Sequence, residues 1–334
     1  MRKSRSDAFL RVMVVLATAL AVWPAPAVGL GLDGTAAPPP FLGAVPVRGA
    51  ALGMGQEKDR GMGSLVTSGR LIYHGGPVMR TNKTFAIYWV PSGRSMVSGY
   101  RSTIDRYLHD VAADSGGVQN VYSTLTQYSD TTGPIAYSQK FGGSTTTTDA
   151  FPSNGCPAYD GLRVCLTDAQ VSAQIKRVIA AKGWVAGPTH SFFLFVPKNV
   201  GTCEDAAGST CAFTAYCAYH SWIGTGATQI VYASMPYADT DPGSCSTGQS
   251  PNGTDADDTL NLASHEHREM IEDPRGDAWY DSAGNEGADK CAWKFGPRLG
   301  STTAGDYNQT INGHHYFVQE EWTNARSTCV QRGT

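Results

Sequence analysis

The sequence predicts a layered α/β (α+β) domain in which helices flank a mixed β-sheet and disulfides staple the loops. Runs of β-branched and aromatic residues, typical of buried strands, alternate with segments whose apolar residues recur at helical spacing. The predicted order is strand, helix, two strands, helix, two strands and a closing helix, which is typical of a sheet covered by helices. We see no internal repeat and no linker that would divide residues 65–334 into two domains.

The first two helices have recognisable ends. Apolar residues at helical spacing predict a helix over 100–111, which ends near Gly116. The second helix begins at a capping box, in which Thr167 stands three residues before Gln170, and it ends at Gly183. Both segments are long enough to cover one face of a sheet.

Strand and loop signals occupy the chain between the helices. Three apolar runs predict interior strands at 84–90, 191–196 and 229–233, and weaker patterns predict strands at 121–128 and 134–137. The run GGSTTTTD at 142–149 predicts a solvated loop. The Gly- and Cys-rich stretch 201–258 predicts mostly loop.

The N-terminal region predicts export. Basic residues precede an apolar run and a small-residue site at 25–27, which indicates a signal peptide over 1–27. A Gly/Ala/Pro-rich stretch over 28–64 predicts a flexible leader, and 65–334 a single globular domain. No later stretch approaches the ~20 apolar residues of a membrane span. We therefore expect a secreted, extracellular protein.

Composition excludes some partners. Hydrophobic residues make up 41% of the 334 residues and charged residues 16%, and the net charge is −3. This balance gives no electrostatic reason to expect binding to nucleic acid or to anionic membranes.

The 8 cysteines predict four disulfides, since an even count in an exported chain favours pairing. Spacing alone does not determine the connectivity. Closing the shortest loops pairs Cys156 with Cys165 and Cys203 with Cys211, and leaves the pairs Cys217–Cys245 and Cys291–Cys329. A cysteine-based metal site is disfavoured because no CxxC pair occurs.

The third predicted helix carries the sharpest chemical motif. It begins after the acidic run 255–258, with Asp257 or Asp258 as the N-cap, and contains the pattern HExxE. His265 and Glu269 are four residues apart and so share a helix face, where both could bind Zn2+. Glu266 stands beside them as a candidate general base.

The third metal ligand must come from outside the helix. The motif resembles that of the thermolysin-like gluzincins, in which an acidic third ligand follows at a similar distance, and Asp289 stands 20 positions after Glu269. In that family the sequence around the third ligand is Asn-Glu followed by an Asp, and this pattern instead matches Asn285-Glu286. We favour Asp289 and keep Glu286 as the alternative.

Other interpretations of this region stay open. An HExxE string arises by chance about once in a hundred such chains, and a surface helix on which Arg268 pairs with nearby carboxylates is the structural alternative. His267 points away from His265, toward solvent or a supporting position. Candidate transition-state donors are His220 and His314, with the neighbouring His315 and Tyr316. The acidic run 255–258 could also hold Ca2+ but lacks EF-hand spacing.

Taken together, the motifs resemble the EXORDIUM-like (phosphate-induced protein) family of secreted proteins. The matching pieces are Tyr73–Pro77, Tyr216–His220, Ser264–Glu269, Asp273-Pro274, Ala278–Tyr280 and Asn285–Cys291. The resemblance covers residues 70–330 and implies an extracellular globular domain, whereas it implies no particular reaction. The leader and the pair His267-Arg268 depart from the family pattern.

We expect a secreted metal-dependent hydrolase, most simply a zinc peptidase that acts on a peptide or cell-wall substrate. In this interpretation His265, Glu269 and Asp289 hold Zn2+ and Glu266 accepts a proton from water. The alternative is a non-catalytic extracellular or cell-wall-associated binding or signalling protein with a structural metal site. Four tryptophans could stack on sugars or lie in the core: Trp222, Trp279, Trp293 and Trp322. No pattern predicts an oligomeric state.

Overall fold

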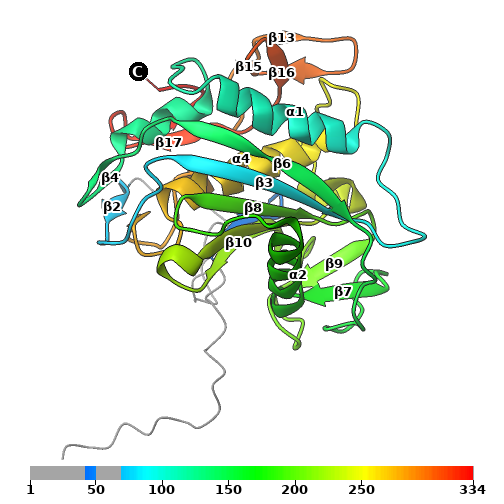
Figure 1. The fold of residues 1–334 in the computed structure, drawn as a ribbon. Helices are drawn as coiled ribbons and strands as arrows, with labels where there is room; N and C mark the ends of the chain where they lie inside the picture. Colours follow the sequence, from blue (N-terminus) through cyan, green and yellow to red (C-terminus); the bar gives the residue numbers. More distant parts are fainter. Residues whose placement is uncertain (1–41, 50–68, 334) are drawn as a thin grey trace, which may run out of the picture. The chain divides into compact units, whose positions relative to one another are not determined.

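Six strands form a central sheet with the order β1-β10-β11-β8-β3-β6 (Figure 1). Strands β11, β8, β3 and β6 run parallel to one another, whereas β1 and β10 are antiparallel to their neighbours. In sheet order the bounds are Leu42–Pro46, Tyr216–Ile223, Ile230–Met235, His190–Phe195, Asn82–Trp89 and Gln139–Thr147. This computed structural model, which describes residues 42–49 and 69–333, therefore confirms a mixed α/β fold.

Helices cover both faces of the sheet. Helices α1 (Tyr100–Ala113) and α4 (Ala256–Glu272) pack on one face, where α1 contacts β6 and β3 and α4 contacts β10, β11 and β1. The 3-10 helix η1 (Val121–Gln127) lies beside α4. Helix α2 (Asp168–Lys182) packs on the opposite face, against β8 and β11 (Figure 1). The layered arrangement predicted from the alternation of elements is confirmed.

Local sequence signals account for α2. The hydroxyl of Thr167 accepts a hydrogen bond from the backbone N–H of Gln170, and the Gln170 side chain accepts one from the N–H of Thr167. Gly183 ends the helix with φ 63°, a left-handed conformation that glycine adopts without steric cost. The predicted capping box and C-terminal glycine are both confirmed.

Two predicted strands are wrong in whole or in part. Residues 121–127 form the 3-10 helix η1, because the Asn120 side chain accepts from the N–H of Tyr122 and the hydroxyl of Thr124 bonds back to the Val121 carbonyl. Of 134–137, only Pro134 is in a strand: β5 (Gly133–Pro134) pairs with β4 (Ser129–Asp130). In such segments, side chains form hydrogen bonds with backbone groups that a strand would otherwise use. Strand propensity does not take this competition into account.

The predicted loops are also corrected. The threonine-rich run at 142–149 lies mostly in β6, an edge strand in register with β3, where β-branched threonines suit the half-exposed face. The stretch 201–258 contains the end of β9 (Val200–Cys203), all of β10 and β11, and the short helix α3 (Pro242–Cys245). Strand β11 confirms the interior strand predicted at 229–233, whereas β6 and β10 were not predicted as strands.

Most of the remaining elements are short and form two-stranded sheets around the central layers. Strand β2 (Ile72–Tyr73) pairs with β12 (Trp279–Tyr280), and β7 (Val164–Thr167) pairs in parallel with β9. Three C-terminal hairpins follow: β13 (Gly300–Ser301) with β14 (Asp306–Tyr307), β15 (Gln309–Ile311) with β16 (His314–Tyr316), and β17 (Glu321–Thr323) with β18 (Thr328–Val330). The other 3-10 turns are η2 (Gly226–Thr228), η3 (Ala238–Thr240) and η4 (Asp289–Cys291).

The predicted cysteine pairing is confirmed in full. The four disulfides join Cys156 to Cys165, Cys203 to Cys211, Cys217 to Cys245 and Cys291 to Cys329. Three of them hold segments that contribute no long helix or strand, which fits the role of disulfides where a regular core is thin. Although three of these sulfurs lie close enough together to suggest a metal site, all three are in disulfides and are not thiolate ligands.

The N-terminal predictions are only partly within the described residues. The expected signal peptide, residues 1–27, lies outside them, as does most of the expected leader. Residues 42–46 of that leader form strand β1, although the composition predicted no regular structure there. The reason is tertiary, because β1 pairs with the edge of β10.

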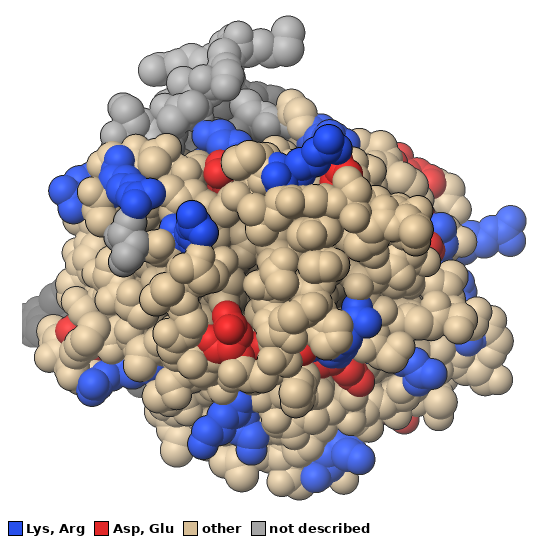
Figure 2. All heavy atoms as spheres, turned by 90° about the horizontal axis from the view of Figure 1, so that it is seen from above, with Lys and Arg blue, Asp and Glu red and all other residues tan. Residues whose placement is uncertain are grey.

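Two further features of the described residues are their hydropathy and their surface charge. No helix among them combines the length and apolarity that crossing a membrane requires. On the face shown in Figure 2, lysine and arginine side chains are scattered among uncharged residues. That face presents no continuous basic surface of the kind that binds nucleic acid.

Candidate metal centre

Helix α4 is a core helix. Every one of its residues from Ala256 to Glu272 is buried, including those with charged side chains. The alternative of a surface helix with a charged face is therefore wrong, and so is the prediction that Asp257 or Asp258 is the N-cap, since Asp255 precedes the helix and both lie in its first turn. Burial in the low-dielectric interior is costly for charged groups unless they are paired or bind a metal.

Three candidate ligands converge beside α4. His265 Nε2 lies 3.1 Å from Glu269 Oε1, one helical turn on, and 3.3 Å from Asp289 Oδ1. Ligand atoms around a tetrahedral Zn2+ at the usual bond lengths are about 3.4 Å apart. Both distances from His265 Nε2 match the spacing of zinc ligands, and one ligand atom from each of His265, Glu269 and Asp289 lies within 4.8 Å of the other two. The predicted set is therefore brought together.

The loop that carries Asp289 is held in place by three restraints. The N–H of Asp289 donates to Glu269 Oε1 at 3.0 Å, and the disulfide from Cys291 ties η4 to β18. Lys290 Nζ forms a buried ion pair with Asp281 at 2.6 Å. Asp289 is therefore pre-positioned against the helix rather than carried on a free loop.

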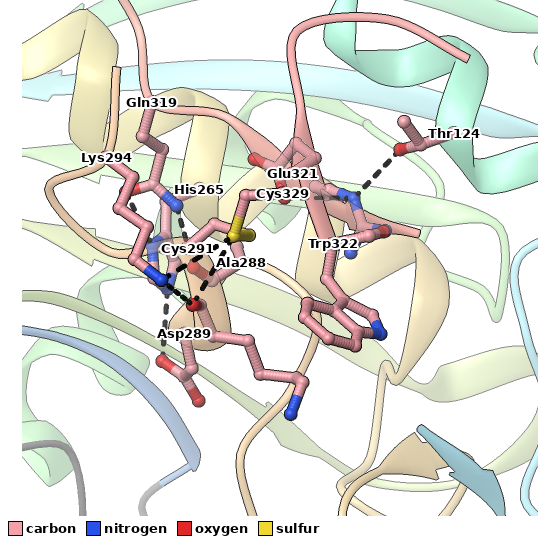
Figure 3. The surroundings of a disulfide bond; sticks show 12 residues. Thr124, His265, Ala288, Asp289, Cys291, Lys294, Gln319, Glu321, Trp322 and Cys329 are labelled. Carbon is pink, nitrogen blue, oxygen red and sulfur yellow. Dashed lines mark hydrogen bonds and ion pairs between the residues drawn. A yellow bond between two sulfur atoms is a disulfide. The ribbon is translucent and has the colours of Figure 1, made fainter. Parts of the chain in front are cut away.

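Gln319 determines which nitrogen of His265 is available. Gln319 Nε2 donates to the Ala288 carbonyl at 2.8 Å, so its Oε1 must face His265 Nδ1, 3.2 Å away (Figure 3). Because an amide oxygen only accepts, Nδ1 carries the proton. Nε2 then has its lone pair, or a second proton, directed toward Glu269 and Asp289. A hydrogen bond of this kind to the far nitrogen accompanies most metal-binding histidines.

A second group of side chains adjoins the first. His220, from β10, places Nδ1 3.2 Å from Glu266 Oε2 and 3.6 Å from Glu269 Oε2. Its Nε2 lies 3.8 Å from Glu286 Oε1. Glu269 therefore belongs to both groups, one oxygen facing His265 and the other facing His220. Of the two predicted donors, His220 is in the cluster, and Glu286 adjoins it instead of replacing Asp289.

The cluster contains buried atoms that the chain itself leaves without hydrogen bonds. Within the described residues these atoms are His220 Nε2, His265 Nε2, Glu266 Oε1, Glu269 Oε2 and Glu286 Oε1. Orphaned polar atoms are rare in protein interiors, and five in one place is the pattern expected of a cation site. The residues present therefore fit a bound metal ion.

The pKa shifts also indicate that the buried carboxylates lack enough positive charge around them. Burial, reinforced by neighbouring carboxylates, raises the pKa of Glu266 and of Glu286 well above the usual value. Burial lowers the pKa of His220 to about 4. For His265, burial opposes protonation but the charge of Glu269 outweighs it and raises the pKa. A divalent cation would stabilise the carboxylates in their ionised form.

Arg268 anchors α4 in the core. It is 1% exposed and forms ion pairs with Glu272, one turn on, and with Glu321 at 3.0 Å. Gly287 allows this approach, since a Cβ atom there would collide with the guanidinium. The pairing of Arg268 with carboxylates was expected on a surface, but it occurs in the core, where it joins α4 to β17.

Two other predicted positions lie outside the cluster. His267 is a core residue, not a solvent-facing one: its Nε2 lies 2.8 Å from Thr84 Oγ1, and burial lowers its pKa to about 3. His314, the other predicted donor, is in β16, where its Nδ1 bonds Asp110 Oδ2 at 2.7 Å. Among the tryptophans, Trp322 is 1% exposed and belongs to the core.

Sequence reasoning missed two residues that the structure places at the site. Gln319 belongs to no recognisable motif and lies 54 residues from His265, so no local signal could have found it. Gly43 lies in the expected leader, yet its backbone is next to His220 and Glu269.

No protein-family model, curated protein or solved structure matches this chain. The functional argument therefore depends on the geometry of the cluster and on the chemistry of its residues.

Proposed function

We propose that the protein is a secreted zinc-dependent hydrolase, and that it acts on peptide bonds. The observation that carries the proposal is the convergence of His265 Nε2 with oxygens of Glu269 and Asp289, while Gln319 holds the far side of the imidazole. Two carboxylates and one neutral imidazole form a ligand set that Zn2+ accepts, with a fourth position left for water. The four disulfides and the resemblance to the EXORDIUM-like family support an extracellular location.

In this proposal Glu266 acts as the general base. It follows His265 on α4, and its Oε1 has no hydrogen-bond partner among the described residues. A bound Zn2+ would lower the pKa of its water toward ~7. Glu266 would accept the proton from that water and pass it to the leaving amine. His220, whose Nδ1 is 3.2 Å from Glu266 Oε2, orients the carboxylate.

One observation favours a different function, a structural metal in a non-catalytic extracellular protein. The side chains of His265 and Glu269 have no exposed surface, whereas a catalytic metal must meet substrate. The two functions differ in what Glu266 does, because a structural site needs no general base.

The first experiment measures metal. Purified protein should contain about one zinc per chain, and His265→Ala should lose it. His314→Ala is the matched control, because His314 is a histidine on Asp110 outside the cluster, and this variant should keep its zinc. Two zinc ions per chain would place the second at His220, Glu266 and Glu269 and would remove Glu266 from the role of base. A zinc-free wild-type protein would contradict the proposal.

The second experiment tests catalysis. Glu266→Gln keeps the size of the side chain and removes its basicity, so zinc content should stay near wild type. Hydrolysis of a mixed peptide library, followed by mass spectrometry, should fall by ~10² or more. Zinc retention with unchanged cleavage would exclude the mechanism. If neither the wild type nor Glu266→Gln cleaves any peptide, and the Gly43→Val variant described below is also inactive, the structural metal would be favoured.

A further inference from the structure

Strand β1 brings its backbone against the candidate metal centre. A Cβ atom on Gly43 would lie 2.2 Å from His220 Cε1 and 2.4 Å from Glu269 Oε2, so only glycine fits there. The backbone of Val45 also forms a hydrogen bond with the Glu266 carboxylate. A short extended segment thus contacts three members of the cluster through its main chain.

The segment contacts β10 through backbone pairing, and it also contacts Trp293 and η4. On one side, β1 pairs antiparallel with the edge of β10, including the partners Ala44 and Tyr219. On the other side, Trp293 Nε1 donates to the Pro46 carbonyl at 2.8 Å, and β1 contacts η4, which carries Asp289. Val45 is fully buried between them. This is the geometry in which proteins bind an extended peptide, with a strand edge on one side and side-chain contacts on the other.

Several features make the segment displaceable. Its pairing with β10 is irregular at two places, between Leu42 and Ala44 and between Val45 and Pro46. Pro46 has no N–H to donate, and Gly43 has φ 31°, so two of five residues weaken an edge strand. The other five strands stay hydrogen-bonded in one sheet when β1 leaves, and β10 then becomes the edge.

We propose that the edge of β10 beside the cluster is a binding site for an extended peptide, and that residues 42–48 occupy it as an internal inhibitory segment. This inference rests on the proposed hydrolase function, because it explains how fully buried ligands would meet a substrate. The peptide class follows from the occupant: uncharged and apolar over 42–47, with glycine beside His220. A basic residue follows, since Arg48 donates to the Ser246 carbonyl at 3.3 Å. An acidic peptide would be repelled by Glu266, Glu269 and Glu286.

The first test replaces Gly43 by valine in the full-length chain. The new side chain would overlap His220 and Glu269 and should expel the segment. Gly49→Val is the matched control: Gly49 also has positive φ, but no atom of residues 42–49 or 69–333 lies within 4 Å of its Cβ position. Zinc transfer to a small chelator should be about tenfold faster or more for Gly43→Val than for Gly49→Val, and cleavage of an apolar peptide should rise similarly. Equal transfer rates from two zinc-loaded variants would overturn the inference.

The second test supplies the segment in trans. A synthetic peptide with the sequence of residues 42–48, LGAVPVR, should bind Gly43→Val, slow zinc transfer and inhibit cleavage. The same peptide with valine in place of its glycine carries the steric conflict itself and should show none of these three effects. Protection by both peptides, or by neither, would show that the accelerated release came from damage to the cluster and would overturn the inference.

A third measurement needs no substitution, so it decides the matter even if Gly43→Val does not fold. In wild-type protein, the N–H groups of Val47 and Arg48 are bonded to the Ala215 and Ser244 carbonyls. If the segment leaves on its own, their hydrogen exchange should be about 100-fold faster than that of strand β11. Exchange at the rate of β11 would mean that the segment opens only on global unfolding, which contradicts the proposal.

The results separate the two proposals. If the hydrolase function fails, no variant cleaves peptide, yet zinc transfer, peptide binding and hydrogen exchange follow the pattern given above. If the peptide site fails, those three measurements show no effect even when the wild-type chain is active.

Discussion

The N–H of Asp289 donates to Glu269 Oε1 at 3.0 Å, which joins the loop ligand to the second helix ligand through the protein itself. The same oxygen of Glu269 lies 3.1 Å from His265 Nε2. The three candidate ligands are therefore pre-organised, and a metal ion would bind without ordering a loop. Pre-organisation of this kind lowers the entropic cost of binding.

This contact predicts which acid is the third ligand. Asp289→Asn keeps the backbone hydrogen bond to Glu269 but removes a carboxylate 3.3 Å from His265 Nε2, so zinc affinity should fall by about tenfold or more. Glu286→Gln, the matched control, alters a carboxylate that faces His220 instead and should weaken zinc less. Competition with a chromogenic chelator measures both affinities. The reverse order would make Glu286 the ligand.

Gln319 should control zinc affinity without binding zinc. Gln319→Leu removes the acceptor that holds the Nδ1 proton of His265, so affinity should drop by about 10- to 100-fold. Gln309→Leu removes a second buried glutamine, whose side chain bonds the Gln331 carbonyl and not the cluster. That control should lower thermal stability while leaving zinc affinity unchanged. Equal zinc affinity in wild type and Gln319→Leu would show that the tautomer is set by some other contact.

Arg268 should be essential for stability. Arg268→Met leaves the carboxylates of Glu272 and Glu321 buried without their cation, which should cost about 3–5 kcal/mol of unfolding free energy. Arg298→Met removes an exposed pair with Asp306 and should leave the unfolding free energy close to that of the wild type. Urea unfolding followed by tryptophan fluorescence gives both values. A cost for Arg268→Met as small as that of the control would mean that solvent reaches the network.

Asp239 should destabilise the protein at neutral pH. Burial, reinforced by the charges of Asp255 and Asp258, raises the pKa of Asp239 from 3.8 to about 6. The folded state therefore holds the Asp239 proton more tightly than the unfolded state. Because of this, the stability that the protonated side chain contributes is lost as pH rises from about 4 to about 6. The shift corresponds to about 3 kcal/mol, which solvent screening at this half-buried position reduces to about 1 kcal/mol.

Asp239→Asn removes this titration and should raise the unfolding free energy at pH 7 by about that amount. The difference in unfolding free energy between Asp239→Asn and wild type should shrink as pH falls. It should vanish below pH ~4, where Asp239 is protonated in both the folded and the unfolded state. Denaturant unfolding between pH 3.5 and 7 makes the comparison, and a difference that does not change with pH would contradict the assignment.

The sequence by itself determined the features that depend on neighbours along the chain. The capping box at Thr167, the stop at Gly183 and the interior strands follow from local hydrogen bonding and periodicity, and the helix with its HExxE spacing follows for the same reason. The even cysteine count predicted four disulfides, and closing the shortest loops suggested the pairing, which spacing alone did not determine.

Only the tertiary structure decided which residues complete the site and which segments become strands. Asp289 was expected from its distance to Glu269, and His220 was a candidate donor without a predicted partner. The contact of Gln319 with His265 and that of His220 with Glu266 join segments far apart in the chain, and spacing carries no record of them. Strand β6 and strand β1 form because adjacent strands offer unpaired backbone groups, although their own residues are Thr-rich or Gly- and Pro-containing. The burial of α4 likewise depends on its packing against α1, η1 and the sheet, because a helix with so many charged residues has no local signal for the core.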